Sequence, residues 1–312
     1  MKIISIVAPV IVMLALGLLC RKLGILTQQG TTVIKKYITT IALPVTIFHA
    51  MGTAEYSKDI WLIAGVMIIV VLTGFFVGFL LKGIVKEPYR KYFPYVMTVY
   101  EGGMLAFPLY QNLCGEERLS NIAIVDMGVC VFSFGIYFSM LEMTDSGNRI
   151  DGKNIVKNAL KSPPFIALLF GLLFGLTGWL KGLVALPAGE IYLSVKNIIV
   201  APLSAMILLC VGFDFQLERS RIGICLKTVF IRFTLQVLML ALVLWLAGKW
   251  RLDSYMLTAF AIYLTVTPSF CLTSFVKNEE VNKYMATTIS LYMILSILSY
   301  MVIAYFSAIQ GV

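Results

Sequence analysis

Long apolar runs separated by short polar connections extend along the whole chain. Ten of these runs are each close to the roughly 20 residues that an α-helix needs to cross a bilayer. They span residues 3–20, 33–52, 60–81, 93–114, 121–141, 163–180, 190–213, 223–248, 254–276 and 284–308. The pattern predicts an all-α polytopic membrane protein with ten transmembrane helices. Its longest polar connection, residues 142–162, separates a first five-helix repeat at 1–141 from a second at 163–312.

Composition and charge support this interpretation. The 312 residues are 60% hydrophobic and 13% charged, which is too apolar for a soluble domain. Seventeen of the 25 Lys and Arg residues lie in the odd-numbered loops, including 142–162. The positive-inside rule therefore places these loops in the cytoplasm and both termini outside the cytoplasmic (inner) membrane. This topology explains the net charge of +9, so nucleic acid is not an expected partner.

The two halves carry prolines at corresponding positions inside apolar runs. A shift along the chain that brings Pro108 onto Pro268 is nearly the same as the shift that brings Pro44 onto Pro202. A proline inside a helix removes a backbone hydrogen bond, and in lipid the freed groups need partners from protein or a watery cavity. Because each half has an odd number of helices, the second enters the membrane inverted relative to the first. Interrupted helices at matching places in inverted repeats indicate a transporter's binding site.

Small and polar residues flank the two central breaks and form the predicted binding site. They are Glu101, Gly102, Gly103, Phe107, Pro108, Tyr110, Gln111 and Asn112 in the first half, and Thr265, Thr267, Pro268, Ser269 and Thr273 in the second. If both helices unwind and cross, half-helix N-termini and freed carbonyls could hold an anion or a small cation. The alternative is a pair of kinked packing helices whose hydroxyls bond back to the main chain.

Glu101 is the most informative of these residues, because a carboxylate deep in an apolar span is costly and is a functional hypothesis by default. It could be a proton site or a partner for a cationic group of the substrate, or it could form a buried structural pair with Arg232 or His49. Asp126, His49 and Arg232 are the candidate coupling or charge partners. Each also has an ordinary alternative: Asp126 could reach the outer interface, Arg232 could extend back to the cytoplasmic end of its span, and His49 could be a packing residue.

Several classes of chemistry lack their sequence signatures. The chain has no Walker A loop, no Gly-x-Ser-x-Gly elbow and no His-Glu-x-x-His motif, so an ATP-driven pump or a membrane hydrolase is not expected. The six cysteines are scattered without a Cys-x-x-Cys or a Cys/His cluster, so neither a metal nor another cofactor is predicted. The first 20 residues could pass for a signal peptide. Because Leu18 and Leu19 precede Cys20 in place of a small-residue cleavage site, we interpret them as the first span.

Four segments carry a family resemblance: LPVTIFHAM (43–51), FPLYQNLCG (107–115), APLSAMILLCVGF (201–213) and TPSFCLTSFVKNEEV (267–281). By the order and spacing of these segments, the chain resembles a bacterial member of the auxin efflux carrier family, which includes malonate and malate permeases and the plant PIN carriers. The resemblance implies a fold similar to that of the bile-acid/sodium symporters, with a scaffold domain and a transport domain. It also implies that helices four and nine cross at Pro108 and Pro268 and that transport uses elevator-type alternating access.

One residue departs from the family pattern. The family commonly carries an asparagine, implicated in binding the substrate carboxylate, seven residues before the helix-four proline, and this chain has Glu101 there. A fixed negative charge would repel an organic anion, whereas a protonated Glu101 could donate a hydrogen bond to a carboxylate or carry the coupling proton. An ionised Glu101 would favour a cationic or zwitterionic substrate.

We therefore expect a secondary transporter, not an enzyme, that moves a small polar organic solute such as an organic acid, an amino acid or a related compound. The expected coupling ion is H⁺, carried by Glu101, or Na⁺, held by carbonyls and hydroxyls of the crossing helices. The alternatives are a sodium-coupled symporter of the same fold, a membrane sensor or receptor without net transport and, third, an intramembrane enzyme. Expected partners are the solute and the lipid bilayer, and a homodimer is left open.

Overall fold

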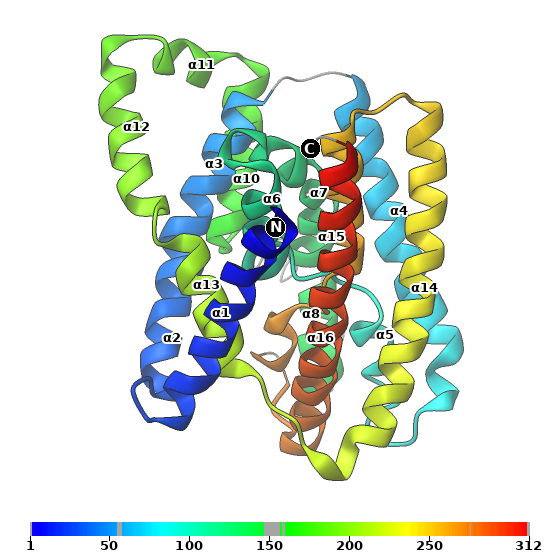
Figure 1. Ribbon diagram of the computed structural model, residues 1–312. Coiled ribbons are helices and arrows are strands. Elements are labelled where there is room, and N and C mark those ends of the chain that lie inside the picture. The colour runs from blue at the N-terminus through cyan, green and yellow to red at the C-terminus, as the bar shows by residue number, and fades with distance from the viewer. Residues whose placement is uncertain (1, 55–57, 147–156, 158–159, 275, 311–312) are drawn as a thin grey trace.

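The computed structural model describes residues 2–54, 58–146, 157, 160–274 and 276–310. In these residues all regular secondary structure is helical, and the one β contact is an isolated antiparallel bridge between Tyr100 and Pro268. Figure 1 shows most of the long helices running up and down through the molecule. The prediction of an all-α protein is confirmed.

The first half of the chain forms a series of helices that are often interrupted. They are α1 (Lys2–Lys22), α2 (Gln28–Tyr37), η1 (Ile38–Ala42), α3 (Leu43–Thr53), α4 (Lys58–Leu81), η2 (Lys82–Ile84), α5 (Phe93–Val96), η3 (Gly102–Ala106), α6 (Phe107–Cys114), η4 (Glu116–Arg118), α7 (Leu119–Phe132), η5 (Ser133–Tyr137) and α8 (Phe138–Ser146). The segments η1, η3 and η5 are π-helical, and each continues directly into the α-helix that follows it.

The second half contains fewer and longer helices. They are α10 (Pro163–Leu176), α11 (Trp179–Val184), α12 (Pro187–Val200), α13 (Leu203–Asp214), η6 (Arg219–Arg221), α14 (Ile222–Lys249), α15 (Ser254–Thr265), η7 (Phe270–Ser274) and α16 (Glu279–Gln310). A short turn joins α12 to α13, and a non-helical stretch separates α15 from η7. The predicted linker at 142–162 lies partly outside the described residues.

Within the described residues, four helical segments are long and apolar enough to cross a membrane: Ile60–Ile84, Pro187–Asp214, Arg219–Lys249 and Glu279–Ser307. Other predicted spans consist of shorter helices. The predicted span at 93–114, for example, is divided by the non-helical stretch between α5 and η3. The structure thus supports a helical membrane protein, whereas the count of ten spans stays a prediction.

Large apolar side chains are prominent on the outer surface. Ile69, Ile198 and Phe230 are 63%, 77% and 71% exposed, and they lie on three different helices. Apolar surface of this extent is unfavourable in water but is solvated well by acyl chains. The surface is therefore that of a protein surrounded by lipid.

The four prolines that the repeat aligns lie where helices start or are interrupted. Pro44 and Pro108 occupy the first turns of α3 and α6, each just after a π-helical segment. Pro202 is the N-cap residue of α13, and Pro268 lies in the non-helical stretch between α15 and η7. For Pro202 and Pro268 the missing backbone N–H has no regular helical acceptor, whereas Pro44 and Pro108 each follow a π-helical turn, which is where the helix departs from the regular hydrogen-bond pattern.

The helices pack in two groups (Figure 1). In the left half of the view, α1 packs along α13 and α10 packs along α3. A Cβ at Gly17 would lie 2.1 Å from the Leu209 carbonyl oxygen, so α1 and α13 approach each other at backbone distance. In the other group α4 packs on α7, and α14, α15 and α16 pack on one another. The groups meet where α1 contacts α16, where α3 contacts α7, and where α13 contacts η3 and α6, the two segments that follow the first break.

Candidate functional site

The two central breaks lie against each other. Tyr100 and Pro268 form the isolated antiparallel bridge, and the Glu101 N–H donates to the Thr267 carbonyl oxygen at 2.9 Å. The backbone between α5 and η3 therefore pairs with the backbone between α15 and η7. Polar backbone groups in an apolar environment need partners, and here the two interrupted segments supply them to each other.

The Glu101 carboxylate lies at the start of two short helical segments. Its Oε1 accepts from the Met104 N–H at 3.1 Å, near the start of η3, and its Oε2 accepts from the Phe270 N–H at 2.6 Å, where η7 begins. The Ser269 hydroxyl donates to Oε2 at 3.1 Å. Unsatisfied N–H groups at helix starts carry partial positive charge, which explains how a carboxylate that is only 5% exposed is accommodated. The Glu101 carboxylate is thus itself the anion at these helix starts.

Asp126, on α7, lies close to the same backbone. The Tyr263 hydroxyl donates to its Oδ1, and the Cys130 thiol lies 3.1 Å from its Oδ2. A Cβ at Gly102 would lie 2.6 Å from Asp126 Oδ1 and 2.9 Å from the Tyr263 hydroxyl oxygen. Only glycine therefore allows the first break to approach Asp126. The outer-interface position that the sequence allowed for Asp126 does not describe it, because its side chain is buried and faces the break.

The two carboxylates border one cavity of about 260 Å³, which we call the acidic cavity. Its polar lining includes Glu101, Asp126, Ser133 and Ser269, and apolar residues such as Leu43 cover much of the remainder. Among the described lining residues there is no Lys, Arg or His. Nor does either carboxylate form an ion pair within the described part of the chain. The cavity thus combines two carboxylates with no compensating basic side chain.

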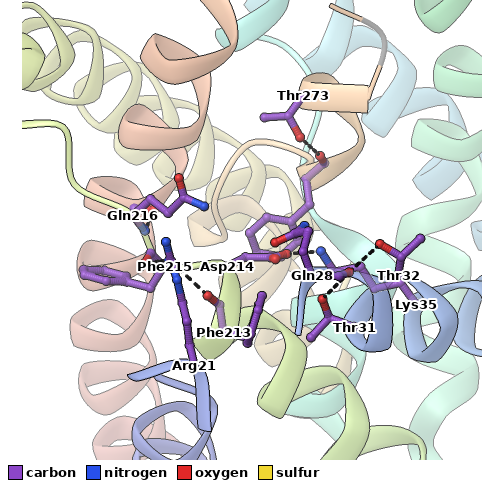
Figure 2. Close-up of polar contacts among 12 residues, drawn as sticks. Arg21, Gln28, Thr31, Thr32, Lys35, Phe213, Asp214, Phe215, Gln216 and Thr273 are labelled. Carbon is purple, nitrogen blue, oxygen red and sulfur yellow. Dashed lines mark hydrogen bonds and ion pairs between the residues drawn. The ribbon is translucent and has the colours of Figure 1, made fainter. Parts of the chain in front are cut away.

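A larger cavity of about 590 Å³, here called the vestibule, adjoins the acidic cavity and shares Thr39, Met104 and Cys271 with its lining. It extends to the segments that follow α1 and α13, on the side of the loops predicted to be cytoplasmic. Figure 2 shows Lys35 and Asp214 forming an ion pair here. The lining of the vestibule also includes Lys36, so the structure places a polar space with two lysines and one carboxylate next to the acidic one.

Beside Asp214, the end of α13 is held by Arg21. Its guanidinium donates to the Phe213 and Phe215 carbonyl oxygens at 3.3 and 3.0 Å (Figure 2). These acceptors lie at the C-terminus of the helix, where carbonyl groups lack intrahelical partners and a positive charge is favourable. Arg21 thus fixes the vestibule wall that carries Asp214.

Arg232, on α14, is fully buried at the other side of the first break. Its guanidinium donates to the Val96 carbonyl oxygen and, at 2.8 Å, to the Val99 carbonyl oxygen, and it lies 5.2 Å from the centre of the Tyr100 ring. In the amide orientation that satisfies its neighbours, Gln236 accepts from Arg232 Nε and Nη2 at 3.0 and 2.9 Å. Arg232 therefore caps the carbonyls that the break leaves open, and its side chain does not extend to the cytoplasmic end of its span.

The sequence matches the membrane transport protein family over residues 2–304. The chain belongs to the auxin efflux carrier family. It is 26% identical over 184 residues to an uncharacterized transporter of Methanocaldococcus jannaschii, a match that covers 56% of this chain and 58% of that protein. It is also 26% identical over 202 residues to an uncharacterized transporter of Methanothermobacter thermautotrophicus, covering 60% of this chain and 62% of the other. The resemblance seen in the four sequence segments is confirmed.

The description of this family as membrane transport proteins agrees with the apolar outer surface of the helices. The matched regions span about three fifths of the two archaeal relatives.

In this family member, His49 lies away from the acidic cavity. Its Nδ1 is 3.1 Å from the Tyr192 hydroxyl oxygen, and it lines a separate pocket of about 430 Å³ between α3, η4 and α12. In that pocket Lys196 pairs with Glu116 at 2.5 Å. His49 and Glu101 thus belong to different polar spaces, and the pairing that the sequence left open is not formed.

Three predicted residues that follow Pro108 make contacts between helices. Tyr110 donates to a backbone carbonyl at the start of α15 at 3.2 Å. Gln111 accepts from the Ser204 hydroxyl on α13 at 2.8 Å, and Asn112 donates to the Tyr300 hydroxyl on α16 at 3.0 Å. None of the three lines the acidic cavity. They hold α6 against both helix groups.

The remaining predicted residues divide between packing and lining. Phe107 is buried in the core, and the Thr265 and Thr267 hydroxyls donate to backbone carbonyls at 2.7 and 3.2 Å. Thr273 lines the vestibule and donates to the Phe270 carbonyl oxygen at 3.0 Å. Gly103 lines the acidic cavity beside Gly102. The alternative of back-bonded hydroxyls therefore describes Thr265, while Ser269 bonds to Glu101.

Sequence reasoning did not include Tyr263, Cys130 and Ser133 in the site. Cys130 carried a usable signal, because it follows Asp126 by four residues and so lies on the same helix face. Tyr263 had a weaker one, since a tyrosine in an apolar helix usually needs a partner for its hydroxyl. Ser133 begins a π-helical turn, and no pattern in the sequence pointed to that turn.

Proposed function

We propose that this carrier is a secondary transporter that moves a small polar organic solute across the cytoplasmic membrane by alternating access. One observation carries the proposal: two interrupted segments from different halves of the chain meet beside a cavity whose lining includes two buried carboxylates. Ionisable groups inside a membrane protein are costly and mark solute or ion pathways. Paired interrupted helices are a common form of transporter binding site.

In the proposed architecture, ten spans form two inverted five-helix repeats whose fourth and ninth helices cross at Pro108 and Pro268. The two packing groups support a scaffold formed by α1–α3 and α10–α13 and a transport domain formed by the other helices. Shared lining residues between the vestibule and the acidic cavity support access from the side predicted to be cytoplasmic. An elevator movement of one group along the other would carry the cavity toward the opposite side.

Glu101 is the proposed coupling residue. The other titratable groups that line the acidic cavity are Asp126 and Cys130 on α7, Tyr100 in the first break, Tyr263 on α15 and Cys271 on η7. Two carboxylates in one buried space repel each other when both are ionised, so a proton or a cation must accompany them. Sodium is the second candidate for the coupling ion, because carboxylate and hydroxyl oxygens are the ligands that hard cations prefer.

Counterflow in proteoliposomes tests the proposal. Labelled dicarboxylates, amino acids, amines and indole acids would be offered between pH 6 and 8, with and without sodium, to the wild-type protein, Glu101→Gln and Glu190→Gln. Glu190 lies in the first turn of α12 and is exposed, so it is a matched control. We expect solute-specific counterflow in the wild type and the control, and loss of transport or of its pH dependence in Glu101→Gln. A sensor would give no counterflow, and an unchanged rate and pH profile in Glu101→Gln would exclude Glu101 as the coupling residue.

A further inference from the structure

The donors that a solute carboxylate would use are already bonded to the protein. The N–H groups of Met104 and Phe270, at the starts of η3 and η7, both donate to Glu101. Arg232 donates to backbone carbonyls of the break, and Lys35 pairs with Asp214 in the vestibule. Lys36 also lines the vestibule, but it is not among the lining residues of the acidic cavity. An anionic solute entering the acidic cavity would therefore meet two carboxylates and no basic side chain of its lining.

The acidic cavity has hydrogen-bond acceptors available, in contrast to its lack of available donors. An ionised carboxylate has about four acceptor positions. Glu101 receives three donors and Asp126 two from the described residues. About three acceptor positions are then available to a ligand, which equals the number of N–H donors on a primary ammonium group.

The unpaired hydroxyl of Ser133 independently indicates a ligand in the acidic cavity. Ser133 lines the acidic cavity, the residue is 5% exposed, and its hydroxyl oxygen has no hydrogen-bond partner within the described part of the chain. Buried polar groups are nearly always paired in native proteins, so an unpaired hydroxyl on a residue of the cavity wall indicates a contact with what the cavity binds. Ser133 could accept from an ammonium group beside Asp126.

The size and the apolar part of the lining favour an organic cation over a bare ion. A volume of about 260 Å³ corresponds to roughly nine water molecules at about 30 Å³ each. Leu43, Ile47 and Val129 line the cavity, and the rings of Tyr100 and Tyr263 lie 5.6 Å apart at its edge. Aliphatic side chains accept a short hydrocarbon body, and tyrosine faces attract cations. Across the described residues, no group of three or more His, Cys, Asp and Glu side chains could hold a metal ion.

We infer that the acidic cavity binds the ammonium group of a small amine or amino acid, with Glu101 and Asp126 as its anionic partners and Ser133 as a further acceptor. The inference rests on the proposed transport function and narrows its substrate to compounds with a primary ammonium group. Two sources share this chemistry. A simple amine would use the acidic cavity alone, whereas an amino acid would extend its carboxylate toward Lys36 in the vestibule, since Lys35 is paired with Asp214.

Ligand-induced thermal stabilisation of the purified full-length protein, combined with counterflow, tests the inference. The probes are n-butylamine, putrescine and L-alanine. The comparison compounds are the anions butyrate and malonate, the neutral butyramide, and sodium chloride as a source of a bare cation. The variants are Asp126→Asn, which keeps the shape and an acceptor for Tyr263, and Ser133→Ala, with Glu190→Gln as the control outside the cavity. Stabilisation by mass action gives an apparent Kd for each probe.

We expect saturable stabilisation of the wild type and the control by at least one ammonium compound. Asp126→Asn should weaken this binding by about tenfold or more, the loss of a charge-assisted hydrogen bond, and Ser133→Ala by about threefold. Binding by n-butylamine and putrescine would identify an amine carrier, and preference for L-alanine would identify an amino acid carrier.

Three results would overturn the inference. They are saturable binding or counterflow of malonate or butyrate without any ammonium compound, stabilisation by sodium chloride alone, and unchanged ammonium affinity in a folded Asp126→Asn protein. Absence of binding by every ammonium probe counts equally against it. Malonate or butyrate counterflow would leave the proposed transport function intact, so the two conclusions can fail separately.

Discussion

Glu101 and Arg232 are two buried charges of opposite sign that lie on either side of the same break. Arg232 donates to the carbonyl oxygen of Val96, the last residue of the short helix α5, and to that of Val99, which follows the helix. Glu101 accepts from the N–H groups of Met104 and Phe270, where η3 and η7 begin. Each charge thus matches the sign of the helix end it contacts, a cation at carbonyls and an anion at N–H groups.

The surroundings of the two charges differ in a way that separates their roles. Arg232 has no exposed surface and lines none of the three cavities described above. Glu101 borders the acidic cavity, where Asp126 adds a second negative charge. A charge that is enclosed by protein stabilises the break, whereas a charge that borders a cavity also acts on whatever enters it. The comparison predicts that Arg232 is needed for folding and Glu101 for solute selection.

The largest effect on stability is expected from Arg232→Met, which tests whether Arg232 is needed for folding. Two buried carbonyls would lose their charged donor, so we expect the free energy of unfolding to fall by about 3–5 kcal/mol, the range for removing one member of a buried charged network. Denaturant or thermal unfolding in detergent measures this change. Protein that remains folded should keep the solute preference of the wild type.

Arg221→Met is the matched control for that experiment. Arg221 lies just before α14, donates to the Tyr89 hydroxyl at 3.2 Å and is 3.7 Å from Glu280, near the surface. We expect a loss below about 1 kcal/mol, as for other surface ion pairs. Equal stability of the two variants would mean that the Val96 and Val99 carbonyls find other donors, and the assignment of Arg232 to folding would be wrong.

The position of the site could be predicted from the sequence because its determinants are individual residues. Prolines at matching places interrupt the helices, and Glu101 is conspicuous as a carboxylate between apolar residues. The partners of Glu101 could not be predicted in the same way. Two of them are backbone N–H groups, which every residue except proline carries, so nothing in the sequence distinguishes Met104 and Phe270 as donors.

Asp126 shows why the second carboxylate was harder to place. The helix α7 that carries it is apolar on all sides, and most of its residues are buried. Without a polar face there is no periodic pattern that shows which side of the helix faces the break. Tertiary packing of α7 on α4 sets its direction, and that information is spread over many apolar contacts. The all-α fold could be predicted from the apolar runs, whereas the number of complete spans depends on how interrupted helices are counted.

An intermediate effect is expected from Gly102→Ala. This variant tests whether the backbone beside the acidic cavity can move away from Asp126 and Tyr263 without loss of transport. The added Cβ would lie 2.6 Å from Asp126 Oδ1 and 2.9 Å from the Tyr263 hydroxyl oxygen, so the pair or the backbone must move. We expect overpacking to cost about 1–3 kcal/mol and counterflow to fall by about tenfold or more. Unfolding and counterflow measured on the same preparation separate the two effects.

Gly103→Ala provides the comparison one residue along. Its Cβ would lie 2.6 Å from Leu43 Cδ2, the end of a flexible side chain that can rotate away. We expect a cost below about 1 kcal/mol and a smaller loss of counterflow than in Gly102→Ala. If both variants behaved alike, the close approach of Gly102 to Asp126 would not matter for transport.

The smallest effect concerns Lys196 and Glu116, a buried base whose partner is a side-chain carboxylate and not the backbone. The Lys196 side chain is 8% exposed and that of Glu116 is 48% exposed. Glu116→Gln would leave Lys196 charged and largely buried, so we expect a loss of about 1 kcal/mol, well below that of Arg232→Met. Lys196→Met would leave Glu116 in contact with solvent and should change the unfolding free energy by less than about 0.5 kcal/mol.

Thermal unfolding of both single variants and the double variant measures the coupling energy between Lys196 and Glu116. If the free energy of unfolding fell as much in Glu116→Gln as in Arg232→Met, a side-chain carboxylate would stabilise a buried base as well as backbone carbonyls do. The larger structural role inferred for Arg232 would then not follow from its contacts with the backbone.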